Sequence, residues 1–301
     1  HKLKYLCSMF RNLIFVWICF SLIACEREIN IVPVNKDSRL VVDAEIENGR
    51  APIVVLSKSL NFFSKIDSAE LTNSYVRNAT VTIQEGNTVY PLKEFELRDT
   101  SGNRFYYYST DSQTTPQLIG QFGKTYKLSI NVNGTSYTSE TTIPLLTKTM
   151  DSIWWKPAPN NDDPKKVVLM ARVQDPPGLG NYIRYFTRQN SQPFLPGLNS
   201  VFDDNIIDGK TYDIQVDRGV NRNEEVDFET YGFFQKGDTV SVKLCNINKS
   251  TFDFWRTWEF NLQSVGNPFS SPGKVIGNIS NNALGAFCGY AAQYRSLIIP
   301  K

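Results

Sequence analysis

TYKLSINVNGTSYTSETTIP, residues 125–144, alternates polar and apolar side chains on either side of Asn133-Gly134. A period of two is typical of strands that bury one face, and Asn-Gly between two such runs is the strongest short-range signal for a hairpin. Five similar runs precede it, the first being RLVVDAEIE at 39–47 and the last FYYYST at 105–110. About seven strands in about 110 residues predict an immunoglobulin-like β-sandwich over residues 39–146.

The second half of the chain begins after a hinge at 144–150. Runs rich in β-branched and aromatic residues continue from there, and Pro176-Pro177-Gly178 between two of them predicts a hairpin. We expect a second, larger β-rich domain over residues 151–301, with one packed helix near 251–265, in a mainly β protein. Its expected strands are DSIWWKP at 151–157, KKVVLMARVQDP at 165–176, NYIRYFTRQ at 181–189, KTYDIQVDR at 210–218 and DTVSVKLCNIN at 238–248.

The expected helix carries Trp255 and Trp258 on an apolar face, which predicts that both are core, and Ser250 is its expected capping residue. Residues 267–290 follow, rich in Gly, Asn, Pro and Ser but with apolar side chains at intervals. We expect this segment to wrap the second domain as a structural clasp; the alternative is a mobile tail that binds a partner. The expected anchors are Phe269, Val275, Ile279, Leu284 and Phe287.

Residues 1–24 have the organisation of a secretory signal peptide, with basic residues followed by an apolar run from Leu13 to Ala24. Twelve apolar residues rise only about 18 Å as a helix, short of a hydrocarbon core of about 30 Å. The ending LIAC at 22–25 resembles the bacterial lipobox. We therefore expect cleavage before Cys25, acylation of Cys25 by palmitate or similar chains, and a tether over residues 25–38. A plain signal peptide with an accidental cysteine is the alternative.

Charge and histidine content narrow the possible functions. Removal of Lys2, Lys4 and Arg11 with the signal leaves 29 basic against 30 acidic residues and no basic run, so we expect no nucleic-acid partner. The one histidine is His1, also in the signal. Its loss excludes His-activated nucleophiles and His-ligated metals, and we expect neither a metal nor a cofactor. We expect a non-enzymatic protein, with a carboxylate-dependent hydrolase as the enzymatic alternative.

Two cysteines, Cys245 and Cys288, remain in the part of the chain after Cys25. An even number in an exported chain predicts a disulfide between neighbouring strands, with Cα atoms within about 7 Å. Two buried free thiols are the alternative.

Two acidic segments resemble functional motifs. Asp203 to Gly209 looks like a calcium loop, but Ile206 stands where an oxygen ligand is needed, so we favour a solvated turn. Glu225, Asp227 and Glu229 would share one face of an extended strand at a spacing suited to a catalytic pair, but an ordinary acidic edge strand has the same pattern.

Adjacent aromatic residues supply the candidate ligand contacts. Neighbours on a strand point to opposite faces, so each group should place one ring in the core and one outside it. An exposed ring could stack on a sugar or dock on a protein, although packing is the favoured interpretation. The candidates are Tyr107, Tyr108 and Trp155.

Several segments together resemble one family. LVVDAEI with IVVLSKS, VRNATVTI, YKLSINVNGTSY, VFDDNIIDGKTYDI and the ending NPFSSPGKVIGNISNNALGAFCGY occur here in the order typical of domain-of-unknown-function family four-two-four-nine, lipoproteins of the Bacteroidota. Members are typically encoded beside SusC-like TonB-dependent transporters. No catalytic residue of the family is established, so none is carried over.

The resemblance implies an outer-membrane lipoprotein that serves a TonB-dependent, SusC-like transporter barrel as an accessory or ligand-capturing subunit. Its ligand would be a glycan or a peptide. The alternative is an independent carbohydrate-binding protein of the cell surface. Acidic residues after the acylated cysteine resemble the signal for surface display in this lineage, and Glu26 and Glu28 favour the surface over the periplasmic face.

Overall fold

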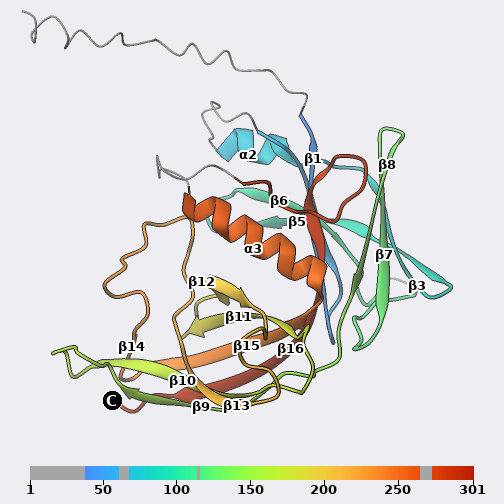
Figure 1. Ribbon diagram of the computed structural model, residues 1–301. Coiled ribbons are helices and arrows are strands. Elements are labelled where there is room, and N and C mark those ends of the chain that lie inside the picture. Colours follow the sequence, from blue (N-terminus) through green and yellow to red (C-terminus); the bar gives the residue numbers. More distant parts are fainter. Residues whose placement is uncertain (1–37, 61–67, 114–115, 265–272) are drawn as a thin grey trace, which may run out of the picture. The chain divides into compact units, whose positions relative to one another are not determined.

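Strand β1 (Leu40–Glu47) organises the sheets, because it is paired along both edges. The computed structural model describes residues 38–60, 68–113, 116–264 and 273–301 (Figure 1). Within them β1 pairs antiparallel with β2 (Ile53–Lys58) and parallel with β16 (Leu284–Ile298), which comes from the other end of the chain. The signal peptide, Cys25 and residues 25–37 of the expected tether lie outside the described residues.

The expected sandwich is confirmed. One layer is an eight-stranded sheet in the order β12-β11-β15-β16-β1-β2-β6-β5, and the facing layer is the four-stranded sheet β4-β3-β7-β8. Between the layers lies a core that includes Val42, Ile46, Tyr126 and Phe287, none more than 1% exposed. The remaining strands of this half are β3 (Thr80–Glu85), β4 (Thr88–Pro91), β5 (Lys93–Arg98), β6 (Arg104–Ser109), β7 (Thr125–Val132) and β8 (Thr135–Thr142).

The second half is also β-rich, as predicted, but its expected hairpin is wrong. Strand β10 (Lys166–Gln174) pairs with β9, β13 and β14, whereas β11 (Tyr182–Gln189) belongs to the eight-stranded sheet. The chain therefore passes from one sheet to another between them. The other strands are β9 (Thr149–Pro157), β12 (Leu195–Phe202), β13 (Thr211–Val216), β14 (Phe234–Gln235) and β15 (Thr239–Ile247).

The two predicted domains are not separate, because β16 belongs to both. Residues 284–290 of β16 pair with β1, and residues 291–298 pair with β15. Residues 38–301 accordingly form one compact unit. The hinge at 144–150 separates two local sequence patterns, but the shared strand joins them through pairing that is remote in sequence.

The predicted helix is present as α3 (Lys249–Ser264), and a short helix α2 (Ser68–Ser74) was not predicted. The cap is Asn248 rather than Ser250: the Asn248 side-chain oxygen accepts a hydrogen bond from the Thr251 amide at 2.9 Å. Helix α3 packs against β11, β12 and β16 and buries Phe252 and Phe254, while Trp255 and Trp258 are half-buried.

The segment after α3 packs on the protein, but it also bonds to the first half of the chain, whereas the clasp hypothesis expected it to wrap the second domain. Asn278 accepts a hydrogen bond from Ser139 and Ser280 bonds the Thr138 amide, both on β8. Phe287 is buried, and Val275, Ile279 and Leu284 are half-buried, although Leu284 and Phe287 lie in a strand rather than a loop. Phe269 lies outside the described residues.

Gly285 makes the β1–β16 pairing possible. Its φ is +96°, and a Cβ atom would lie 1.9 Å from the Val42 carbonyl oxygen. We expect Gly285→Ala to lower the free energy of unfolding by about 2–3 kcal/mol, because it combines left-handed strain with a backbone clash. Gly134→Ala, at φ +83° in open space, is the control and should cost only about 1 kcal/mol in urea unfolding. Equal losses would show that the close approach at Gly285 contributes nothing.

Candidate functional site

Asp43 and Glu45 project from β1 on the face opposite the sandwich core. Val42, Ala44 and Ile46 alternate with them and are buried between the two layers. On the outer face, Asp43 is paired with Ala286 and Glu45 with Cys288 of β16. The two carboxylates are therefore neighbours on one face of a strand in the middle of the large sheet.

A recess lies beside these carboxylates, between β1, α3 and residues 274–285. Its volume is about 570 Å³. Asp43 is in its wall together with the indole rings of Trp255 and Trp258 and the side chain of Val275. An apolar cavity with aromatic walls and few polar groups is the usual form of a small-molecule site.

Asp43 and Glu45 have no hydrogen bond or ion pair among the described residues. Both side chains reach solvent, yet protein surrounds them closely enough for burial to raise the pKa of each. The Arg184 charge opposes this rise at Asp43, and Lys243 opposes it at Glu45. The effect of burial exceeds that of the cation at both, so the pKa of each is raised although both side chains remain exposed to solvent.

The nearest cations are held by other groups. Lys243 forms an ion pair with Glu47, which also accepts a hydrogen bond from Tyr294. Arg184 donates to the Tyr290 hydroxyl at 2.9 Å, and its guanidinium carbon lies 3.4 Å from the centroid of the Trp255 ring. Neither cation can move to Asp43 or Glu45 without losing these contacts.

Glu259 of α3 organises the polar groups behind the aromatic wall. Its carboxylate accepts hydrogen bonds from the Ser200 amide at 2.9 Å, the Ser200 hydroxyl at 2.5 Å and Arg222 at 2.8 Å. Glu259 is only 3% exposed. Arg222 in turn lies over the Trp258 ring, 4.9 Å from its centroid. This network fixes the tryptophan side of the recess.

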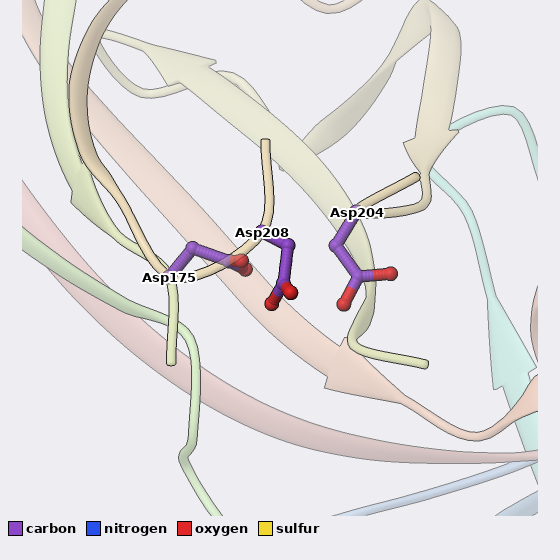
Figure 2. A group of neighbouring side chains, drawn as sticks. All are labelled: Asp175, Asp204 and Asp208. Carbon is purple, nitrogen blue, oxygen red and sulfur yellow. The ribbon is translucent and has the colours of Figure 1, made fainter. Parts of the chain in front are cut away.

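Three aspartates form a second acidic group, in the loops that follow β10 and β12. One carboxylate oxygen from each of Asp175, Asp204 and Asp208 lies within 4.8 Å of the others (Figure 2). Asp175 forms an ion pair with Lys148 at 2.8 Å, and both side chains are fully buried. The ammonium of Lys148 thus supplies positive charge to the group.

The same carboxylates also bind the chain where it passes between sheets. Asp204 accepts hydrogen bonds from the amides of Gly180 and Asn181, and Asp208 from the amide of Gly178. Burial raises the pKa of Asp204, but the bonds from Asn181 and Gly180 outweigh it, so this pKa is lowered. The three aspartates act as a structural clamp on the loop that crosses from β10 to β11.

Comparison of the sequence with models of known families identifies the family of this chain. The family model described as Domain of unknown function (DUF4249) matches residues 26–296. The chain belongs to this family. The resemblance inferred from the sequence is therefore confirmed. No curated protein matches the DUF4249 chain. Among its described residues, no helix is both long and apolar enough to cross a bilayer.

The aromatic candidates of this DUF4249 chain are separated by the fold. Tyr108 is 2% exposed and its hydroxyl donates to the Val76 carbonyl oxygen at 3.0 Å, so it is core and no stacking platform. Tyr107 is half-buried and stacks on Phe95 with centroids 5.4 Å apart. Trp155 is half-buried against the core of the second half. Neither Tyr107 nor Trp155 lines the recess.

The predicted disulfide is wrong: Cys245 and Cys288 are free and buried. Cys245 on β15 faces Ala292 of β16, so Cys288 lies four residues farther along that strand, about 13 Å away. The strands are neighbours, as expected, but the register keeps the sulfurs apart. Burial raises the pKa of both thiols to about 12, which keeps them protonated and unreactive.

The acidic motifs of the sequence have structural roles. Residues 224–229 are irregular up to a turn that begins at Phe228, not a strand, and the Asp227 carboxylate accepts hydrogen bonds from the Glu229 amide and the Thr230 hydroxyl. The argument for a shared face therefore fails. The turn expected at 203–209 is present, but Asp204 is 1% exposed rather than solvated.

Sequence reasoning missed Asp43 and Glu45. A signal was present, since both acids stand at the polar positions of an otherwise apolar strand, LVVDAEIE. An ordinary solvated face gives the same alternation. This face of β1 borders a recess only because α3 and residues 274–285 pack beside it.

Proposed function

We propose that this protein is a non-enzymatic, lipid-anchored, ligand-capturing subunit of a TonB-dependent, SusC-like transporter in the outer membrane. The observation that carries the ligand-capturing role is the recess lined by Trp255, Trp258 and Asp43, a carboxylate that has no hydrogen bond or ion pair among the described residues. The membrane anchor rests on the lipobox-like ending at Cys25, and the transporter partner rests on the family resemblance alone.

The absence of an enzymatic role in this proposal follows from residue types. The part of the chain after the signal has no histidine, and both thiols outside the anchor are buried and protonated at neutral pH. What remains at the recess is a shape and a set of charges suited to holding a ligand. Display on the cell surface, as the acidic residues after Cys25 indicate, would place this recess where a ligand arrives.

Replacing Cys25 with Ser tests the anchor. We expect the unaltered protein in the outer-membrane fraction and the variant in the soluble fraction or stalled as a precursor, because acyl chains alone would hold a chain of this kind on a bilayer. Quantitative immunoblotting of the two fractions measures the change. A variant that fractionates with membranes as before would end the lipoprotein interpretation.

Purification of the tagged protein from solubilised outer membranes tests the partner. We expect a large transporter barrel to be recovered with it in near-equal amount, and not with the Cys25→Ser variant. Recovery of the protein alone, together with glycan binding in an array, would instead support the alternative of an independent carbohydrate-binding surface protein.

A further inference from the structure

The charges around the recess indicate which ligand it suits. Asp43 and Glu45 are two residues apart on β1, which places their Cα atoms about 7 Å apart on one face. Glu47 on the same face is neutralised by Lys243, but Asp43 and Glu45 have no such partner among the described residues. The face of β1 thus carries two carboxylates without an ion-pair partner among the described residues, and Asp43 lines the cavity.

The remaining walls favour an organic cation over a metal ion. Calcium and magnesium are bound by six or more oxygen ligands, whereas the walls around Asp43 are largely aromatic and aliphatic, including Trp255, Trp258 and Val275. Indole rings attract ammonium and guanidinium groups through their π-electrons. The protein itself shows this preference, since Arg184 lies over Trp255 and Arg222 over Trp258.

Two basic residues in the wall of the same recess limit the charge of the ligand. Arg39 and Lys274 also line the recess, and both are exposed. Arg39 and Lys274 would repel a second positive group on the ligand but tolerate a neutral or anionic group. This arrangement favours a ligand with a single cationic group over a polyamine.

We propose that the recess binds one primary ammonium or guanidinium group on an apolar stem, as in the lysine or arginine side chain of a short peptide. Asp43 in the wall is its counter-charge, and Glu45, outside the wall on the same face of β1, adds negative charge. The proposal rests on the proposed ligand-capturing function and names the chemistry of the ligand. Free polyamines share the cationic group, and the experiment separates them from peptides.

The binding should weaken as pH falls. The charged groups that face Asp43 and Glu45 are Glu47 on β1, Arg184 on β11 and Lys243 on β15, with Arg39 and Lys274 in the wall of the cavity. Burial raises the pKa of Asp43 and of Glu45 above the ordinary carboxyl range. Both acids therefore lose their charge at a higher pH than ordinary carboxyl groups do, while the basic groups keep theirs.

Isothermal titration calorimetry with the full-length lipoprotein in detergent tests the proposal. The probes are a terminally blocked Ala-Lys-Ala tripeptide, the same tripeptide with acetylated lysine, and spermidine. We expect the lysine tripeptide to bind and its affinity to fall about tenfold or more in the Asp43→Asn/Glu45→Gln double variant, because a charge-assisted contact is lost. The acetylated tripeptide and spermidine should bind at least about tenfold more weakly.

Glu140→Gln is the control, because Glu140 is an exposed carboxylate on β8 outside the recess; its affinity should match that of the unaltered protein. Equal binding of the acetylated tripeptide, no binding of the lysine tripeptide, or unchanged affinity in the double variant would each overturn the cation assignment. Stronger binding of spermidine would assign the site to polyamines instead of peptides. Recovery of the transporter from membranes is a separate measurement, so failure here leaves the proposed transporter role standing.

Discussion

Replacing Lys148 with Met is expected to lower the free energy of unfolding by about 3–5 kcal/mol, because it leaves the Asp175 carboxylate buried without its cation. The Lys148 side chain is 1% exposed and that of Asp175 is 0% exposed, and their charged atoms are 2.8 Å apart. The carboxylate also accepts a hydrogen bond from the Gly209 amide, so the clamp on the crossing loop should loosen with it. Urea unfolding followed by tryptophan fluorescence measures the loss.

The control for this prediction is an ion pair of the same length on the surface. Arg172 and Asp213 are also 2.8 Å apart, but their side chains are 52% and 38% exposed. Arg172→Met should therefore cost only about 0.2–1 kcal/mol. A loss in Lys148→Met no larger than this would show that Asp175 does not depend on Lys148 for its burial.

Replacing Glu259 with Leu is expected to have an effect of similar size, about 3–5 kcal/mol. Glu259 is the acceptor for the Ser200 amide and hydroxyl and for Arg222, and its side chain is 4% exposed. Its removal leaves the Ser200 amide and hydroxyl without their acceptor and Arg222 without its counter-charge, although Arg222 still donates to the carbonyl oxygens of Gly197 and Leu198. Helix α3 should separate from β12, since these bonds join the two elements.

A double variant shows whether the stability lost in Glu259→Leu comes from the broken ion pair with Arg222 or from lost packing. The Arg222→Met/Glu259→Leu double variant should recover part of the loss, because it removes the uncompensated cation. Glu140→Leu, at an exposed position, should change the free energy of unfolding by no more than about 0.5 kcal/mol. The free energy of unfolding of the double variant is compared with the losses of the single variants Arg222→Met and Glu259→Leu. If the double variant loses as much as these two losses added together, then Glu259 acts by packing rather than through Arg222.

Local patterns predicted most strands, and long-range pairing accounts for the errors. The hairpin of β7 and β8 is found directly, because Asn133-Gly134 sets both the turn and the register. The parallel pairing of β1 with β16 has no local signal, and it merges the two expected domains into one unit. The register between β15 and β16 places Ala292, not Cys288, opposite Cys245, which is why an even cysteine count misled the disulfide prediction.

The candidate site was less predictable than the fold for a related reason. Lys148 and Glu259 stand at polar positions of a hinge and a helix, where burial is not expected of charged residues. Asp43 and Glu45 stand at the polar positions of an ordinary alternating strand. Their role in the site depends on the segments that pack beside that strand, α3 and residues 274–285. In each case the sequence gives the residue type, whereas its environment depends on contacts between distant segments.

Whether Asp43 in the recess and Glu45 beside it are kept at the expense of stability is the central question, and the pH dependence of unfolding answers it most directly. Burial raises the pKa of both acids in the folded state, so the unfolded state binds fewer protons in the window between the ordinary carboxyl pKa of about 4 and the raised values. Stability should therefore fall as pH rises through that window.

The measurement is the free energy of unfolding of the unaltered protein and of Asp43→Asn/Glu45→Gln, by urea titration from pH 4 to pH 7. The account predicts that the double variant is the more stable protein at pH 7 and that its advantage disappears toward pH 4, where the native acids are protonated. A double variant that is equally stable or less stable at pH 7 would show that these carboxylates are satisfied within the fold, and it would contradict their assignment as an unpaired site kept for a ligand.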